Sequence, residues 1–311
     1  MKKFALSMGL LASLLFMGQV VPAQQGELLK VPHGMNPHSN SPNFPGFQAP
    51  TGGTRKATAL VYHGGPLMTG TVNVYLIWYG HWNSSNGTDN AAGQQLVRDW
   101  ASGISATPYF NLNTSLSVSG SAITGAVFYA GQATDAGTAT SITDSDILSI
   151  VNRNVGVGKA LPYDSNAVYF VVTSSDINKD GFCTSYCGWH TAGNIGAGHV
   201  RYSFVGNAAR CINSCAIQTT SPNGNAGIDG AVSVLSHELE EAVTDPDLNA
   251  WFSRSGYENA DECAWTFGHN QYQVANGSWA NMSFGGHDWM IQRNILKTGS
   301  SFYCMVNAGQ N

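Results

Sequence analysis

The sequence predicts a mixed α/β fold, in which a sheet with flanking helices is followed by a smaller, irregular C-terminal lobe. Apolar runs of strand length alternate with stretches of helical periodicity, and this alternation is typical of a mixed sheet covered by helices. Hydrophobic residues make up 43% of the 311 residues, which is enough for one sizeable core. After Pro246 the periodicity ends and aromatic residues are scattered among glycines and polar residues, which indicates the irregular lobe.

The N-terminus predicts a secretory signal peptide over residues 1–23. Two lysines precede an apolar stretch, and Val21-Pro-Ala23 fits cleavage by signal peptidase. The apolar stretch is too short to span a bilayer comfortably, so we expect a secreted protein with no membrane span. Residues 24–58 are rich in Pro, Gly, Asn and Ser and predict a flexible linker or pro-segment, which leaves 59–311 as the folded domain.

The charged content of the chain is low. Charged residues make up 11% of the sequence and the formal net charge is −5, with no basic stripe. We therefore expect no nucleic-acid partner. The composition leaves the oligomeric state open.

Each element before residue 246 has its own pattern. The predicted strands cover residues 71–79, 122–130, 167–173 and 198–205. The predicted helices with an apolar stripe cover residues 91–103 and 144–154. Thr143 is a suitable N-cap for the second helix, and the alternating pattern of 198–205 suits the edge of a sheet.

A third helix, which begins near residue 232 and must end at Pro246, carries the most informative motif of the chain, His237-Glu-Leu-Glu-Glu241. His237 and Glu241 are four residues apart, so they project from one helix face as two ready metal ligands. Glu238 has the position of the general base in the HExxH motif of zinc peptidases, although here the second histidine is a glutamate. A solvated helix face is the alternative, but no Lys or Arg stands one turn away to neutralise these acids.

Several short sequence motifs, called blocks here, occur along the chain between Tyr62 and Cys263. They are Tyr62-His-Gly-Gly-Pro-Leu-Met-Thr-Gly70, Leu76-Ile-Trp-Tyr-Gly80, Thr173-Ser-Ser-Asp176, Gly181-Phe-Cys183, Cys187-Gly-Trp-His190, Val205-Gly-Asn207, His237-Glu-Leu-Glu-Glu-Ala-Val-Thr-Asp-Pro246 and Glu258-Asn-Ala-Asp-Glu-Cys263. Together these blocks resemble the Exordium / phosphate-induced protein family of secreted proteins. The resemblance covers about residues 60–305. It implies an extracellular or cell-wall protein, linked in plants to growth control, and it implies no settled biochemical activity.

The order of strands and helices before His237 is also similar to that of zincin metalloproteases, in which an edge strand borders the cleft above the metal-binding helix. That likeness implies a third metal ligand downstream. Glu258 and Asp261 are the candidates, with a plain turn after Gly256 as the alternative. Zinc is the expected metal, and manganese or calcium is a second option because carboxylates are hard ligands.

Two further sites are predicted, each with an open alternative. His190 follows Cys187 in a disulfide-pinned loop, where it can stabilise an oxyanion or donate a proton, or can be structural. Asp176, Asn178 and Asp180 have the spacing that opens a calcium-binding loop. The closing glutamate of such a loop is missing, so an ordinary turn is the alternative.

All six cysteines lie after residue 180, and their even number in an exported chain predicts disulfides rather than a zinc cluster. The spacing predicts two small loops and one long bridge. The predicted pairs are Cys183–Cys187, Cys211–Cys215 and Cys263–Cys304.

Two functions fit this set of residues. The first is a secreted metal-dependent hydrolase, a zincin-type peptidase in which Glu238 deprotonates a water on a metal held by His237, Glu241 and either Glu258 or Asp261. The second is a non-catalytic extracellular or cell-wall binding or signalling protein. The expected partner is accordingly a peptide or a cell-wall substrate.

Overall fold

The computed structural model describes residues 56–308. The predicted signal peptide, 1–23, and most of the predicted linker, 24–58, therefore lie outside the described residues. The last residues of that linker already belong to the fold, because the N–H of Ala57 donates to the carbonyl of Phe302 at 2.9 Å.

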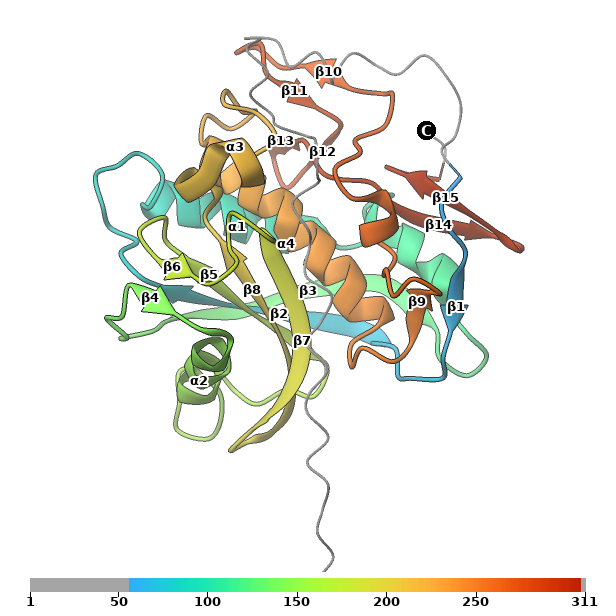
Figure 1. Cartoon of the computed structure of the whole chain (residues 1–311), viewed down its shortest axis with the longest axis horizontal. Coiled ribbons are helices and arrows are strands. Elements are labelled where there is room, and N and C mark those ends of the chain that lie inside the picture. Colours follow the sequence, from blue (N-terminus) through green and yellow to red (C-terminus); the bar gives the residue numbers. More distant parts are fainter. Residues whose placement is uncertain (1–55, 309–311) are drawn as a thin grey trace, which may run out of the picture.

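A five-stranded sheet forms the centre of the molecule, with the strand order β3-β2-β5-β8-β7 (Figure 1). Its strands are β2 (Gly70–Tyr79), β3 (Ile123–Thr134), β5 (Ala167–Thr173), β7 (Gly188–Ile195) and β8 (Gly198–Gly206). Strands β3, β2, β5 and β8 are parallel, whereas β7 is antiparallel to β8. The predicted mixed sheet is confirmed.

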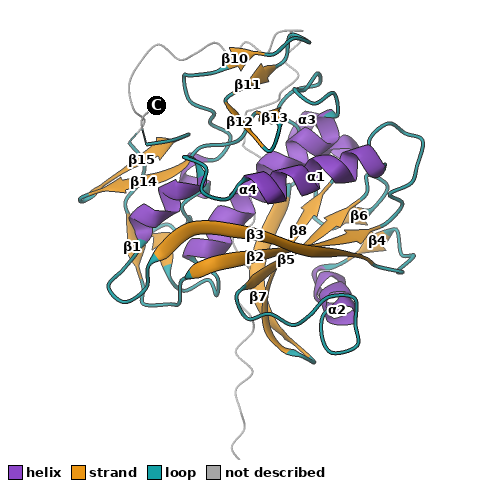
Figure 2. Cartoon of the chain, turned by 180° about the vertical axis from the view of Figure 1, so that it is seen from behind, coloured by secondary structure: helices purple, strands orange, loops and turns teal. Residues whose placement is uncertain are grey.

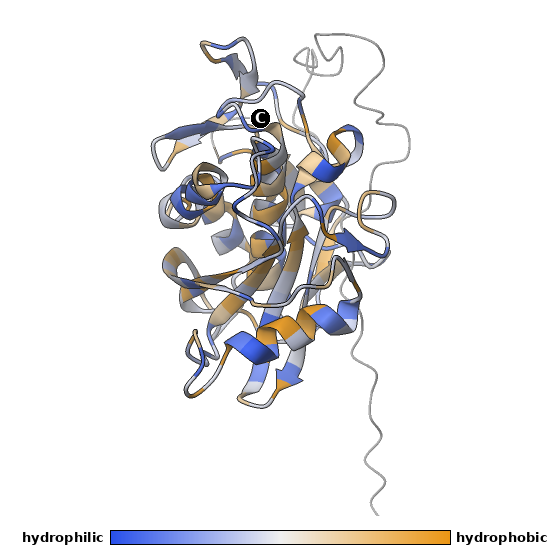
Figure 3. Ribbon diagram, turned by 90° about the vertical axis from the view of Figure 1, so that its left-hand side faces the viewer, coloured by the Kyte–Doolittle hydropathy of each residue, from blue (hydrophilic) through white to orange (hydrophobic). Residues whose placement is uncertain are grey.

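Helices cover both faces of this sheet, as expected. Helices α1 (Ala91–Gly103) and α4 (Ala226–Thr244) lie on one face, and α2 (Asp144–Asn154) lies on the other (Figure 2). The predicted bounds of α1 and α2 are confirmed, and Thr143 caps α2 through a reciprocal capping box with Asp146. Hydrophobic and hydrophilic residues alternate along α2, the lowest helix in Figure 3, because only one of its sides packs on the sheet.

Trp100 joins α1 to both the sheet and α4. Its side chain is 0% exposed, and its ring packs edge-on against Phe170 of β5 with the ring centroids 6.0 Å apart. Its indole Nε1 donates to the hydroxyl of Ser236 on α4 at 2.9 Å. Trp100 therefore fixes the position of α4 at Ser236, the residue that precedes His237.

The edge of the sheet differs from the prediction. The strand 198–205 corresponds to β8, which is covered along its length by the unpredicted strand β7. Strand β7 has the sequence Gly-Trp-His-Thr-Ala-Gly-Asn-Ile, which lacks an aliphatic run, so its strand pattern is weak. The pairing with β8 therefore defines this strand better than its own composition does.

Helix α4 is longer than predicted at its N-terminus. It begins at Ala226 instead of residue 232, and the side chain of Asn225 caps it by accepting from the N–H of Ile228. Its last helical residue is Thr244, so the predicted end before Pro246 is confirmed. Every residue from Gly227 to Thr244 is buried. The alternative of a solvated helix face is therefore wrong.

Two of the three predicted disulfides are wrong. The structure pairs Cys183 with Cys211 and Cys187 with Cys215, each over a sequence separation of 28, and confirms the Cys263–Cys304 bridge. The antiparallel pairing of β7 with β8 brings the segment before β7 close to the segment after β8, so bridges form between the two segments and not within either of them. The order of the two bridges is parallel and not nested, so the hairpin alone does not determine it.

The chain after β9 forms short antiparallel ribbons. The remaining strands are β1 (Leu60–Tyr62), β4 (Ser141–Ile142), β6 (Asn178–Lys179), β9 (Trp251–Ser253), β10 (Tyr272–Gln273), β11 (Trp279–Ala280), β12 (Met282–Phe284), β13 (His287–Trp289), β14 (Asn294–Thr298) and β15 (Ser301–Met305). The short helices are α3 (Ile212–Cys215), η2 (Phe110–Leu116), η3 (Ala208–Cys211) and η4 (Asp261–Cys263).

None of the helices within residues 56–308 has the length and apolar character that crossing a membrane requires.

Candidate metal centre

Strand β7 lies very close to α4. Gly188 and His190 are two residues apart on this strand, so both face α4. A Cβ atom at Gly188 would lie 2.5 Å from Cγ1 of Val234 and 3.1 Å from Oε1 of Glu238. Glycine at this position therefore lets the strand backbone approach the helix and brings His190 beside the HExxE motif.

The HExxE motif and the chain after β9 meet at His237. Its Nε2 atom lies 2.9 Å from Oε1 of Glu241 and 3.4 Å from Oδ1 of Asp261. The backbone N–H of Asp261, at the start of η4, donates to Oε1 of Glu241 at 3.0 Å. The adjacent Cys263–Cys304 bridge ties this segment to β15. The structure thus brings His237, Glu241 and Asp261 together.

His190 joins the same cluster from the opposite side. Its Nε2 atom lies 3.2 Å from each carboxylate oxygen of Glu258 and 3.9 Å from Oε2 of Glu241. The expectation that His190 lies in a loop is wrong, because it belongs to β7. Sequence reasoning gave this histidine a catalytic or a structural role and did not consider it as a candidate ligand. The signal that would have found it is the Gly188–His190 alternation of a strand facing α4.

The cluster is buried. The side chains of His190, His237 and Glu241 are at most 1% exposed, and those of Glu258 and Asp261 are 3% and 5% exposed. The ligand atoms form two overlapping groups, each within 4.8 Å. The first group is His190, Glu241 and Glu258, and the second is His237, Glu241 and Asp261.

Several buried polar atoms of this region make no hydrogen bond within residues 56–308. They include Nδ1 of His190, Nδ1 of His237 and both carboxylate oxygens of Glu238. Leaving a buried polar group without a partner costs about 1–3 kcal/mol, and more for a charged group. Imidazole nitrogens and carboxylate oxygens gathered in this way fit a divalent cation such as zinc or manganese.

Burial and the surrounding charges shift the pKa values of the cluster. Burial lowers the pKa of His190 to about 4 in spite of the nearby Asp245 carboxylate, so this imidazole is neutral at pH 7. Burial also disfavours the charged form of His237, but the hydrogen bond with Asp261 and the surrounding carboxylates leave its pKa raised. Burial, followed by repulsion from Glu241, raises the pKa of Glu238 well above its usual range. The surrounding carboxylates thus raise the pKa values of both His237 and Glu238, whereas burial dominates at His190.

Glu238 belongs to neither ligand group. As the residue after His237, it projects about 100° away around the helix, and its Oε1 atom lies against the backbone of Gly188. Its carboxylate is 0% exposed. Glu238 is therefore a neighbour of the candidate ligands and not a member of either group.

The predicted calcium loop is engaged in other contacts. Oδ2 of Asp176 lies 2.5 Å from Nδ1 of His81. Oδ1 of Asp176 accepts a hydrogen bond from the hydroxyl of Ser174. The side-chain oxygen of Asn178 accepts from Arg210 at 3.0 Å. These contacts are those of a polar turn, and calcium at Asp176, Asn178 and Asp180 stays a prediction.

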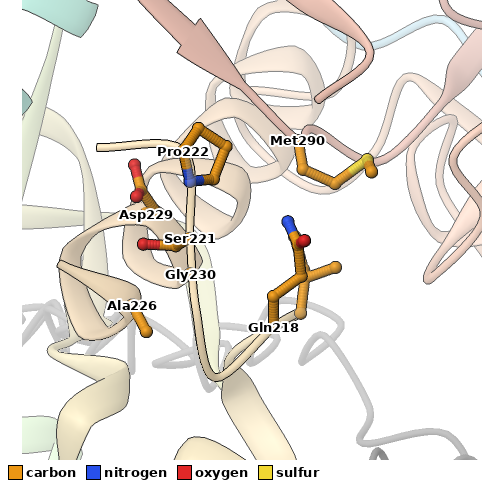
Figure 4. Close-up of a pocket in the computed structure, with 8 residues that line it drawn as sticks. Gln218, Ser221, Pro222, Ala226, Asp229, Gly230 and Met290 are labelled. Atoms are coloured by element: carbon orange, nitrogen blue, oxygen red, sulfur yellow. The ribbon is translucent and has the colours of Figure 1, made fainter. Parts of the chain in front are cut away.

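A small pocket lies near the start of α4, away from the His–carboxylate cluster (Figure 4). It is lined by Ile217, Gln218, Ser221, Pro222, Ala226, Asp229, Gly230 and Met290. Asp229 is held there by Asn223, whose backbone N–H and side-chain amide donate to its carboxylate at 3.0 Å and 2.6 Å. No residue of the two ligand groups lines this pocket.

The replacement of Gly188 by alanine is expected to destabilise the protein. The added methyl group would overlap Val234 and crowd Glu238, and overpacking of this kind costs about 1–3 kcal/mol. The matched control is Gly193→Ala on the same strand, where a Cβ atom would meet Tyr202 at 3.3 Å and Leu148 at 3.4 Å. Urea denaturation measures both variants. Equal stability of the two would contradict the close approach of β7 to α4.

The fold and the site define a class of protein: a mixed α/β domain with a buried histidine–carboxylate centre between an edge strand and a central helix. The family model described as "Phosphate-induced protein 1 conserved region" matches residues 60–288. The chain therefore belongs to the phosphate-induced protein 1 family, and the predicted resemblance is confirmed.

The relatives of the chain include plant proteins. "Protein EXORDIUM-like 3" of Arabidopsis thaliana is 29% identical over 248 residues, which cover 70% of this chain and 72% of the relative. "Protein EXORDIUM-like 5" of Arabidopsis thaliana is 28% identical over 234 residues, which cover 65% of this chain and 61% of the relative. "Protein PHOSPHATE-INDUCED 1" of Nicotiana tabacum is 26% identical over 270 residues, which cover 70% and 79%. No solved structure matches the chain significantly.

Proposed function

We infer that the chain is a non-catalytic extracellular or cell-wall binding or signalling protein whose fold encloses a divalent metal ion. The burial of the HExxE motif carries this inference, because His237, Glu238 and Glu241 are all 0% exposed. A peptidase must bring a scissile carbonyl to a metal-bound water at an open coordination position. Side chains that are closed off from solvent are better suited to holding the fold together.

Membership of the phosphate-induced protein 1 family and the sequence of the N-terminus support a location outside the cell. All six cysteines are paired, which suits an oxidising environment. Partly exposed aromatic side chains, Phe128 at 60%, Tyr163 at 40% and Tyr272 at 39%, offer apolar surface for contact with a cell-wall glycan or a peptide.

A zincin-type peptidase is the second candidate. Strand β7 is an antiparallel edge strand that lies beside α4, and an edge strand beside the motif-bearing helix supports this candidate. Glu238 follows His237, and neither of its carboxylate oxygens has a hydrogen-bond partner among the described residues. A carboxylate in this state is suited to accept a proton from a water molecule. In this role, His190 would be an oxyanion-stabilising group or a proton donor.

A broad peptide-library digest separates the two functions. We expect no cleavage by the purified chain after loading with zinc or manganese, and none by Glu238→Gln. A peptidase would instead cleave, and Glu238→Gln would keep its metal while losing about 10²–10⁴-fold in rate, because that is the typical contribution of a general base. Cleavage by the wild type that is lost in Glu238→Gln would overturn the binding function.

A further inference from the structure

The shared carboxylate of the two ligand groups points to two metal ions instead of one. We propose that the cluster is a dinuclear centre in which Glu241 bridges two divalent cations, one held by His237 and Asp261 and the other by His190 and Glu258. This inference rests on the proposed metal binding and adds its stoichiometry. Neither ligand group by itself uses all five side chains.

The two oxygens of Glu241 face different histidines. Oε1 lies 2.9 Å from Nε2 of His237, whereas Oε2 lies on the side of His190, 3.9 Å from its Nε2 atom. A carboxylate that presents one oxygen to each of two ligand sets has the geometry of a bridging ligand. In two-metal sites of proteins the ions lie about 3.5–4 Å apart, which a single carboxylate spans.

One ion does not account for all five side chains. Ligand atoms bound to the same zinc ion at about 2.0–2.2 Å lie within about 4.4 Å of one another. The five candidate side chains form two groups of three, because Glu241 belongs to both. Within each group the ligand atoms lie within 4.8 Å of one another, which is close to this limit. Each group then contains one histidine and two carboxylates, counting Glu241 in both.

The stoichiometry is measured on the purified chain after removal of bound metal with a chelator and refilling with manganese. We expect about two Mn²⁺ per chain by elemental analysis, and an electron paramagnetic resonance spectrum of two exchange-coupled ions. One ion per chain, or two uncoupled ions, would overturn the dinuclear centre and leave the proposed metal binding intact. A chain that takes up no metal would overturn both.

Single-ligand variants locate the two ions. His190→Ala is expected to lower the manganese content from two ions to one and to abolish the coupling, while the ion at His237 stays bound. His199→Ala is the matched control, because His199 is half-exposed on β8 and pairs with Asp247 at 3.0 Å. Retention of two coupled ions in folded His190→Ala would overturn the assignment. If this variant does not fold, Glu258→Gln tests the same ion. The manganese content of the wild type then still tests the stoichiometry without any variant.

Discussion

The Glu241→Gln variant is expected to lose its bound metal and the stability that the metal provides. Glu241 belongs to both ligand groups, so this single change weakens both. A ligand that binds only the folded state adds about 3–4 kcal/mol when its free concentration is about 100–1,000 times its Kd. We therefore expect a loss of about this size, measured by denaturation in excess zinc, with elemental analysis of the same sample.

A chelator makes this test sharper. Metal removal should lower the unfolding temperature of the wild type and leave that of Glu241→Gln unchanged. The control is Glu240→Gln, since Glu240 is the adjacent buried glutamate but its carboxylate accepts from Asn294 and belongs to neither group. A Glu241→Gln variant that responds to the chelator as strongly as the wild type would disprove the role of Glu241 as a ligand.

The Trp100→Ala variant is expected to show the largest loss of stability outside the metal centre. The indole is fully buried between α1, β5 and α4, and its removal leaves a cavity that the surrounding strands and helices fill only in part. Substitutions of this kind cost about 3–5 kcal/mol in the free energy of unfolding. Chemical denaturation of the metal-free protein measures this loss without any contribution from the ion.

Trp100→Phe is the matched control. It keeps a ring against Phe170 and loses only the hydrogen bond to Ser236, whose hydroxyl still donates to the carbonyl of Val232 at 2.8 Å. We expect it to be clearly more stable than Trp100→Ala. Similar stabilities for the two would show that Trp100 contributes through its indole N–H and not through packing.

The elements with long patterns of their own could be predicted from the sequence. The aromatic and β-branched run of β2 and the capped apolar stripe of α2 each determine a structure locally, so their predicted bounds agree with those observed to within one residue. Strand β7 could not be predicted in this way, because its small and polar residues acquire a strand conformation by pairing with β8. The disulfide errors have the same cause, since they follow from that pairing and not from spacing along the chain.

The candidate site likewise combines residues that the sequence could predict with one whose position depends on the tertiary fold. The four-residue spacing of His237 and Glu241 places both on one helix face, whatever the rest of the fold does. Glu258 and Asp261 were expected downstream, and the structure brings both to the cluster. The place of His190 depends on β7, so only the folded chain could bring it to Glu258 and Glu241.

The paired bridges Cys183–Cys211 and Cys187–Cys215 have a consequence for biogenesis. Both anchor the segment that leads into β7, and His190 lies three residues after Cys187. In the reducing cytosol these bridges do not form. We therefore expect the histidine to reach its final position only after export, when oxidation has locked the β7–β8 hairpin. On the proposed function, the chain would then acquire a metal ion from the extracellular medium, and the metals available there, instead of the cytosolic pool, would determine which ion it carries.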